Sequence, residues 1–403
     1  MVFQGMMRCG GIIKLGGRRM MSYVCKDAYR PLLMVPPLFD DSGNVANKFH
    51  CIGSDEEINY AKKSVGVGGG DGDGDIQVVG MSHGWLALYN RMSHDLCILD
   101  PISGRRVNLP PLPGDTQGGD GVSRVALSDD QNSTVMIYGG GRNLASCVPG
   151  RSKEWAPMAD DEIEIEKERE YEDVIHSGFK DLFYCLTRNP TELERWKVAD
   201  PESPTLVDMT IGAATIDPRS SQGGEWPNLD RCGFPWPCRS QQDRELKNKC
   251  RRIKYAVRGP RGQMYVVVRH VDVNIPYYKT VDFDVYGFEV GSKFRYMKAS
   301  LDGLAFFVGN SQSSSVPAHL HPGLRPNCIY FTDDNRLMQR PSNDNDNDDD
   351  FGGGGGHDNG IFDYQNNSFS TCCGGNCPLD DPGISIKRNR MRMDHAPMWF
   401  HYF

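Results

Sequence analysis

Short apolar runs separated by turn residues dominate the chain, and the clearest set lies in residues 76–114. Two strands are predicted at residues 84–89 and 96–99, joined by a polar turn at residues 90–95. A further turn after Asp100 and Pro101 leads into a third, shorter strand. Loops of two to six residues suit only adjacent antiparallel strands. Three consecutive strands of this kind make most of one propeller blade.

The same rhythm of strands and turns recurs from residue 29 to residue 403. A turn at residues 40–43 separates the first two predicted strands, and a last strand at residues 397–401 is expected to close the ring with N-terminal sequence. At roughly 45–50 residues per blade, the chain suits about six to seven blades. We therefore predict an all-β fold, a single kelch-like β-propeller. Further strands are expected at residues 122–127, 134–138, 182–186, 193–198, 255–257, 264–269, 281–289, 294–299, 305–308 and 328–331.

Two low-complexity segments interrupt the rhythm. Residues 66–75 are rich in glycine and aspartate, and residues 342–360 combine asparagine, aspartate and a glycine run. Neither can bury enough apolar surface to offset the entropy of ordering, so both are predicted to be disordered inserts that loop out of the blades.

The order of residues from His83 onward resembles the KIB-type β-propeller family of plants, whose members often carry an N-terminal F-box. The resemblance is collinear over residues 30–403. It implies a structural signature and a protein-binding role, but no catalytic, cofactor or metal residues. The signature residues are His83, Gly84, Trp85, Leu86, Asp100, Pro101, Gly104, Leu109, Pro110, Tyr330, Phe331, Thr332, Asp333, Asp334 and Trp399.

The resemblance implies a non-enzymatic module that binds a protein partner through propeller loops. No F-box pattern precedes Tyr29, so direct binding to a ligase adaptor is not expected. The alternative is a substrate-recognition protein of a ubiquitin ligase, a truncated F-box relative in the cytosol or nucleus. An enzyme that uses the propeller channel is a further alternative, but no nucleophile elbow, metal triad or cofactor motif occurs in a suitable context.

The composition limits the kinds of partner that the chain is expected to bind. The net charge is −8 and the pI is about 5.7, which argues against a general nucleic-acid binder. No run of 18 apolar residues is present, so no membrane span is predicted. Thirteen cysteines are scattered and odd in number, which favours buried thiols over a disulfide framework.

Residues 1–28 form a separate basic leader or disordered tail. The first 26 residues contain five lysines and arginines and no acidic residue, a composition typical of a transit peptide. A mitochondrial location is therefore one expectation. An inert tail on a cytoplasmic or nuclear protein, or a mis-annotated start, is the other.

Local clusters of reactive residues give no convincing site. The cysteines 372, 373 and 377 offer three thiols without a histidine at ligand spacing, so a metal or redox role is not favoured over a structural one. His83 could line the mouth of the channel, but a structural histidine is preferred. Asp333 and Asp334 follow a strand and suit a polar turn better than acid–base catalysis.

Two charged segments are interpreted as solvent-exposed. The acidic run at residues 160–173 is predicted to be a loop insertion, with a docking patch for a basic partner as the alternative. The basic cluster between Arg244 and Lys254 has no interleaved aromatic residues, so it is weak evidence for nucleic-acid binding. It is predicted to belong to a solvated insertion between blades.

Overall fold

The computed structural model describes most of the propeller. The described residues are 32–39, 45–52, 57–62, 76–90, 93–113, 121–129, 132–158, 169–177, 181–188, 191–198, 204–211, 240–273, 278–288, 294–297, 300–334, 358–371 and 398–400.

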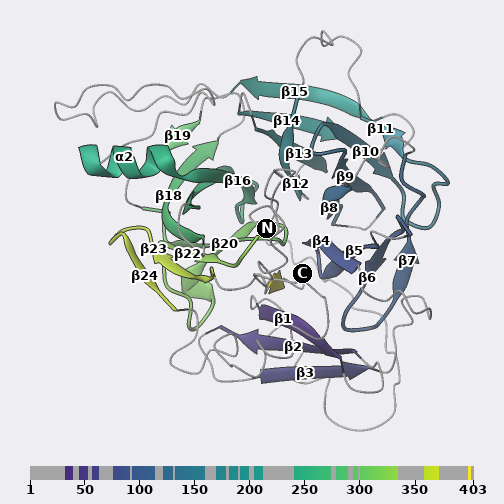
Figure 1. Cartoon of the computed structure of the whole chain (residues 1–403), viewed down its shortest axis with the longest axis horizontal. Coiled ribbons are helices and arrows are strands. Elements are labelled where there is room, and N and C mark those ends of the chain that lie inside the picture. Colours follow the sequence, from purple (N-terminus) through teal and green to yellow (C-terminus); the bar gives the residue numbers. More distant parts are fainter. Residues whose placement is uncertain are drawn as a thin grey trace, which may run out of the picture.

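The described strands form six blades around a common centre (Figure 1). Five blades hold four strands each, and the sixth holds five. This confirms the predicted propeller and agrees with the lower end of the predicted blade number. Blade 1 consists of β25 (Met398–Phe400), β1 (Leu32–Phe39), β2 (Val45–Cys51) and β3 (Glu57–Lys62), and blade 2 of β4 (Ile76–Ser82), β5 (Trp85–Asn90), β6 (Leu96–Leu99) and β7 (Arg106–Asn108). Blade 3 consists of β8 (Val122–Leu127), β9 (Thr134–Tyr138), β10 (Asn143–Cys147) and β11 (Ala156–Pro157), and blade 4 of β12 (Tyr171–Ser177), β13 (Leu182–Thr187), β14 (Glu192–Lys197) and β15 (Thr205–Ile211). Blade 5 consists of β16 (Arg251–Arg258), β17 (Met264–Asp272), β18 (Lys279–Phe288) and β19 (Arg295–Tyr296), and blade 6 of β20 (Leu304–Val308), β21 (Ser314–Pro317), β22 (Cys328–Phe331), β23 (Gly360–Asp363) and β24 (Ser368–Ser370).

Hydrophobic packing between neighbouring blades holds the ring together. Six apolar clusters occur among the described residues, and each joins one blade to the next. In β13 the alternation is direct: Tyr184 packs toward blade 5, whereas Phe183 and Cys185 pack toward blade 3. Because successive side chains of a strand point to opposite faces, a strand packed on both faces is apolar throughout.

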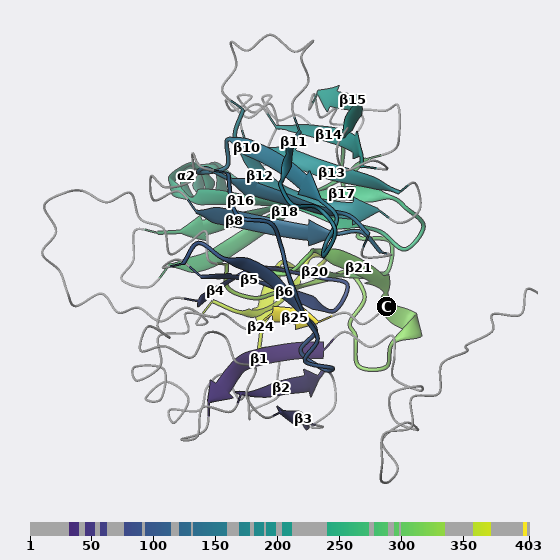
Figure 2. The ribbon, with the colours of Figure 1, turned by 90° about the vertical axis from the view of Figure 1, so that its right-hand side faces the viewer.

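The two ends of the described chain meet in blade 1. Trp399 of β25 pairs with Leu33 of β1 in an antiparallel register, as the sequence predicted. The Trp399 indole nitrogen also donates a hydrogen bond to the Val308 carbonyl of blade 6 at 3.1 Å. The ring of Trp399 meets the rings of Phe307 and Tyr330 edge-on. A single residue thus connects blade 1 to blade 6. Figure 2 shows β1, β2 and β3 at one end of the molecule.

Blade 6 departs from the expected run of hairpins. Strands β20 and β22 pair in parallel, and they are connected by β21 and a short 3₁₀ helix, η3 (Ala318–Leu320). A single parallel bridge between Arg258 and Ser314 joins β21 to β16 of blade 5. Blades 5 and 6 therefore form one nine-stranded sheet.

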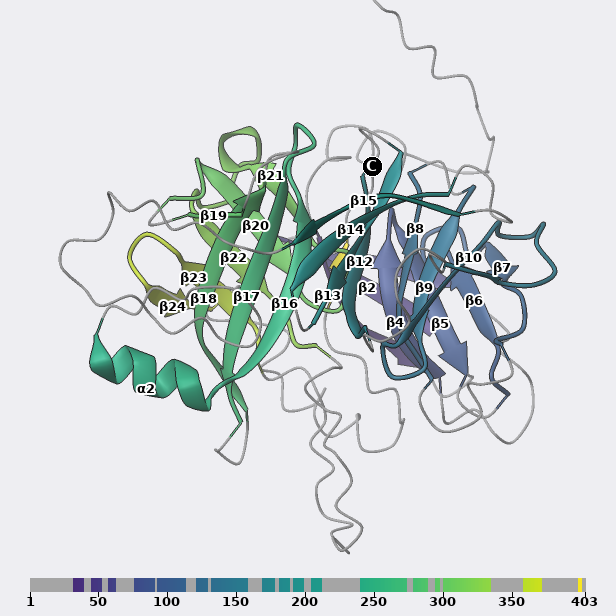
Figure 3. The same ribbon diagram turned by 90° about the horizontal axis from the view of Figure 1, so that it is seen from above.

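An α-helix, α2 (Gln241–Lys249), precedes blade 5 and lies along its outer side (Figure 3). Ser240 caps the helix by accepting a hydrogen bond from the Asp243 amide. Lys247 is buried and lies 2.8 Å from Asp282 and 3.1 Å from Asp284. The prediction of a solvated cluster is therefore wrong for Lys247 and Lys254, which are buried, whereas Arg244 and Lys249 are exposed as predicted. Lys247 can be buried because carboxylates of blade 5 neutralise it.

The end of the acidic run is likewise part of the fold. Residues 159–168 lie outside the described residues, but Glu172 and Asp173 are buried in β12. Only the earlier part of this run remains available as a loop insertion.

The predicted tail and inserts fall largely outside the described residues. This applies to residues 1–28, 66–75 and 342–357, and to the cysteines 372, 373 and 377. Residues 358–360 are described, and Asp358 is buried and paired with Arg269 at 2.8 Å. They belong to the propeller rather than to the insert. No helix in the described part of the chain is long and apolar enough to cross a membrane.

Candidate functional site

A tight turn between β4 and β5 places His83 at one face of the ring. His83 and Gly84 both have positive φ, +49° and +78°, and Ser82 pairs with Trp85 directly across the turn. This is the geometry of a two-residue type I′ hairpin, in which glycine at the second position avoids strain. Gly84 therefore serves the turn, and Trp85, which follows it, is buried in the apolar cluster between blades 2 and 3.

His83 meets residues from the next two blades. Its Nε2 atom lies 2.9 Å from Oδ1 of Asp129, which follows β8. The same carboxylate oxygen lies 3.1 Å from Nδ1 of His176 in β12. We call His83, Asp129 and His176 the His–Asp cluster. The potential ligand atoms of these three residues all lie within 4.8 Å of one another.

Burial and neighbouring groups shift the pKa values of His83 and Asp129. Burial lowers the pKa of His83, and hydrogen bonding to Asp129 offsets this only in part. Burial alone would raise the pKa of Asp129, but hydrogen bonds from His176 and His83 and the charge of Arg258 hold it well below its usual range. Near neutral pH, His83 is therefore an uncharged imidazole beside an ionised carboxylate.

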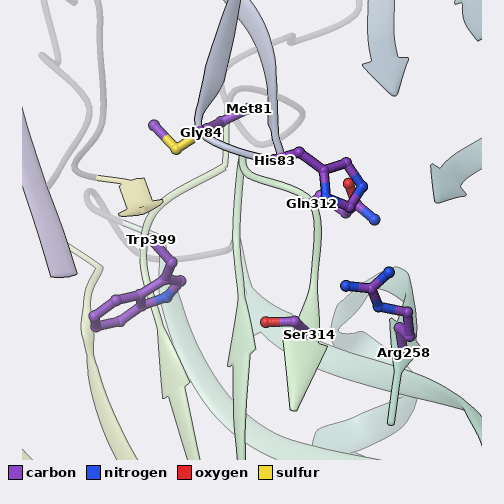
Figure 4. A pocket seen from close by; sticks show the side chains of 7 residues that line it. All are labelled: Met81, His83, Gly84, Arg258, Gln312, Ser314 and Trp399. Atoms are coloured by element: carbon purple, nitrogen blue, oxygen red, sulfur yellow. The ribbon is translucent and has the colours of Figure 1, made fainter. Parts of the chain in front are cut away.

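A small cavity opens beside the cluster. Its volume is about 20 Å³, and its walls include His83, Arg258, Gln312 and Trp399. Figure 4 shows His83, Gln312 and the Arg258 guanidinium around one side of this cavity and Trp399 on the other. A volume of this size holds about one water molecule. The cavity is too small for an organic substrate.

Side chains and backbone fill the centre of the ring next to this cavity. Residues 309–313, which we call the central segment, lie between β20 and β21 of blade 6. The Gln312 amide nitrogen donates to the Met81 carbonyl of blade 2 at 2.6 Å, and its side-chain amide donates to the His176 carbonyl of blade 4 at 3.3 Å. The Asn310 side chain donates to the Val78 carbonyl of blade 2 at 3.1 Å. The central segment thus bridges three blades.

Arg124 of β8 completes this packing from the opposite side. Its guanidinium donates to the carbonyl oxygens of Gly309 and Asn310 at 3.1 and 3.0 Å and to Asp173 of β12 at 2.9 Å. Asp173 in turn accepts a hydrogen bond from the Ala256 amide of β16 at 2.9 Å. Five of the six blades are connected through this polar network.

The remaining signature residues of blade 2 have structural positions. Asp100 accepts hydrogen bonds from the amides of Ile102 and Ser103, and Gly104 has a φ of +70° in the same turn. The carbonyl of Pro110 accepts a hydrogen bond from Trp155 of blade 3 at 2.9 Å. The other signature residues of this blade, Leu86, Pro101 and Leu109, are buried.

The signature residues at the end of β22 are also buried. Tyr330, Phe331 and Thr332 lie in or next to the strand. Asp333 accepts a hydrogen bond from Tyr278 at 2.6 Å, and Asp334 lies 4.0 Å from Arg124. Both carboxylates are fully buried, so they are not in an exposed polar turn. Asp334 therefore faces Arg124 of the central polar network, and Asp333 faces Tyr278 of blade 5.

A larger cavity lies away from the ring centre. Its volume is about 360 Å³, and Tyr278, Phe331, Asp358 and Phe369 contribute to its walls. Phe369 of β24 is 43% exposed.

The sequence did not indicate that Asp129, His176, Arg124 or the central segment would meet His83. These residues come from different blades, and no local motif relates them. The only usable signal was the alternative that His83 could line the channel mouth, which was less favoured than a structural histidine.

A comparison with models of protein families supports the fold. A family model described as the KIB1-4 beta-propeller matches residues 72–363. No curated protein matches the chain. Among solved structures, hydrazine synthase from Kuenenia stuttgartiensis is 10% identical with a TM-score of 0.36, covering 73% of this chain and 72% of that chain.

Two further structures show a similar level of likeness. A nidogen/laminin complex is 7% identical with a TM-score of 0.32, covering 64% of this chain and 85% of that chain. The WD40 domain of SCAP from fission yeast is 9% identical with a TM-score of 0.32, covering 73% and 55%.

Proposed function

The chain belongs to the KIB1-4 β-propeller family, and on that premise we propose that it is a non-enzymatic module that binds a protein partner through the turns of its blades. The observation that carries the proposal is the filled centre of the ring. Arg124 of blade 3 donates to the Asn310 carbonyl of blade 6 at 3.0 Å, so side chains occupy the space that a substrate channel would need. Binding then falls to the surface turns, which suits a protein partner better than a small substrate.

The face that carries His83 is the proposed binding surface. The turns from β6 to β7, from β10 to β11 and from β16 to β17 reach this face, because each follows a strand that ends there. Exposed basic side chains in these three turns are Arg105, Arg151, Lys153 and Arg261, against one exposed acidic residue, Glu154. The same face also carries the exposed Asp129 and Asp181, so the basic side chains are concentrated in these three turns. On a chain with a net charge of −8, these turns favour an acidic segment of the partner.

Charge reversal on the two faces tests the proposal. The test variant combines Arg151→Glu with Arg261→Glu. The control combines Arg142→Glu in the β9–β10 turn with Lys279→Glu at the start of β18, and thus changes the same charge on the opposite face. Each tagged full-length chain is purified from cells, and bound proteins are quantified by mass spectrometry. Partners are then purified and titrated directly at low and high salt.

We expect the test variant to lose a defined set of proteins that the control keeps, and direct binding of these proteins to weaken with salt. Equal retention by both variants would reject the binding face. Release of a small-molecule product by the purified chain would reject the non-enzymatic assignment.

The same purification separates the alternatives on cellular role. Recovery of a ligase adaptor together with a target would favour substrate recognition for a ubiquitin ligase. A C-terminal fluorescent fusion, with and without residues 1–26, distinguishes mitochondrial targeting from a location in the cytosol or nucleus.

A further inference from the structure

We propose that His83, Asp129 and His176 form a binding site for one divalent transition-metal ion, with zinc as the best match. The three residues come from blades 2, 3 and 4. They bring two imidazole nitrogens and one carboxylate oxygen to within 4.8 Å of one another. This inference goes beyond protein binding, because it assigns an ion and a ligand set to the ring mouth.

The distances suit a tetrahedral ion. Zinc binds nitrogen and oxygen ligands at about 2.0–2.2 Å, which places ligand atoms about 3.3 Å apart in a tetrahedron. His83 Nε2 and His176 Nδ1 already lie 2.9 and 3.1 Å from Asp129 Oδ1. Small rotations of these side chains would therefore admit an ion without moving the blades.

The chemistry of the ligands also selects the class of ion. Two imidazoles with one carboxylate suit zinc and related transition metals, whereas magnesium and calcium prefer a shell of oxygen atoms.

Surrounding groups would orient the ligands. The second ring nitrogen of His176, Nε2, lies 3.1 Å from Oδ1 of Asp181. Metal-bound histidines characteristically donate their other N–H to such a carboxylate. Arg258 contacts both carboxylate oxygens of Asp129, Oδ1 at 3.1 Å and Oδ2 at 3.3 Å. An ion on Oδ1 would replace the first of these contacts, and Arg258 can keep the second.

The site has an open position and a route for the ion. The Asp129 side chain is 44% exposed, whereas the His83 and His176 side chains are only 6% and 2% exposed. The adjacent cavity of about 20 Å³ accommodates a water molecule as the fourth ligand. An ion bound by three protein ligands and one water would link blades 2, 3 and 4 at this face of the ring.

Metal titration of the full-length chain tests the site. The chain is purified in the presence of a chelator, dialysed free of it, and titrated with zinc and with cobalt. Bound metal is counted by mass spectrometry, and cobalt spectra report the ligand types. Asp129→Asn and His83→Asn remove ligands, and asparagine tolerates the positive φ of His83. His319→Asn, on the exposed η3 helix, is the matched control.

We expect one ion per chain, a cobalt spectrum without thiolate charge-transfer bands, and a Kd at least tenfold weaker in Asp129→Asn and His83→Asn. His319→Asn should bind as the unchanged chain does. Unfolding in chelator shows whether each variant folds, and Asp129→Asn carries the test alone if His83→Asn does not.

Three results would overturn the proposal. They are less than one ion per chain at saturation, a spectrum dominated by thiolate ligands, and unchanged affinity in a folded Asp129→Asn chain. The last two would locate any bound metal elsewhere in the protein.

Discussion

Arg124 and Asn310 lie on blades that face each other across the ring, yet they are in direct contact. Nη1 of Arg124 donates to the Asn310 carbonyl at 3.0 Å, and Nε of the same guanidinium donates to Asp173 at 2.9 Å. In a six-bladed ring, blades 3 and 6 are diametrically opposite. Their contact means that the centre is a packed polar core, in which each donor and acceptor is costly to remove.

Replacing Arg124 with alanine should lower the free energy of unfolding by about 3–5 kcal/mol, because the Asp173 carboxylate would remain buried without its cation. Urea denaturation measures the change. Arg142→Ala, at an exposed turn, should change it by less than about 0.5 kcal/mol. A similarly small effect of Arg124→Ala would show that the centre is hydrated rather than packed.

Trp85→Ala should cost about 3–5 kcal/mol, because a large buried ring is lost between blades 2 and 3. Trp85 is 7% exposed and belongs to the apolar cluster that joins these blades. Phe369→Ala removes an aromatic ring that is 43% exposed and should cost clearly less. If Trp85→Ala costs under about 1 kcal/mol in denaturant titrations, the ring is not buried. Trp85 would then be a candidate for partner binding.

Gly80→Ala should destabilise the chain by about 1–3 kcal/mol through overpacking. An added Cβ would lie 2.5 Å from the backbone carbonyl oxygen of Val125, so β4 and β8 would have to separate. At Gly303 an added Cβ meets no atom within 4 Å, although φ is +75°. Gly303→Ala therefore isolates backbone strain. Melting temperatures of the two variants compare the effects, and an unchanged value for Gly80→Ala would contradict the close approach of blades 2 and 3.

The free energy of unfolding should fall in acid because of the ion pair between Lys247 of α2 and Asp284 of blade 5. Burial alone would raise the pKa of Asp284, but the charge of Lys247 and a hydrogen bond from His270 outweigh burial and lower it to about 2. The unfolded carboxylate has a pKa of about 3.9. The stabilisation is therefore complete above pH 5, and protonation removes it as the pH falls toward 2.

Chemical denaturation between pH 6 and pH 2 measures this effect. The stability advantage of the unchanged chain over Asp284→Asn should shrink by about 2 kcal/mol across that range. Lys247→Met should show a weaker acid dependence than the unchanged chain, because the cation that lowers the pKa is gone. A constant difference between the unchanged chain and Asp284→Asn would contradict the ion-paired arrangement.

Much of the scaffold could be predicted from sequence, because a blade hairpin is a local structure. The strand predicted at residues 84–89 is β5 (Trp85–Asn90), and the strand predicted at 96–99 is β6. The predicted closing strand at residues 397–401 corresponds to β25, which pairs with β1. An apolar strand at this position can bury its side chains only by packing against other strands, so the pattern indicates closure. Period-two patterning and turn residues carry this information directly.

The rest depended on contacts between distant residues. The residues around α2 read as solvated because they are charged, and nothing local shows that Lys247 reaches Asp282 and Asp284 in the next blade. The three residues of the His–Asp cluster lie in or just after the inner strands of three different blades. The parallel pairing of β20 with β22 also has no counterpart in a local hairpin pattern.

The closure of blade 1 also means that β1 is synthesised long before β25, the strand that pairs with its free edge. About 360 residues separate Leu33 from Trp399, and synthesis at roughly 5–20 residues per second takes some 20–70 seconds to cover them. During that time the edge of β1 that later pairs with β25 has no partner strand. Such an edge is a template for pairing with another chain. A chain that stops before Trp399 is therefore expected to keep this edge exposed and to aggregate more readily than the full-length chain.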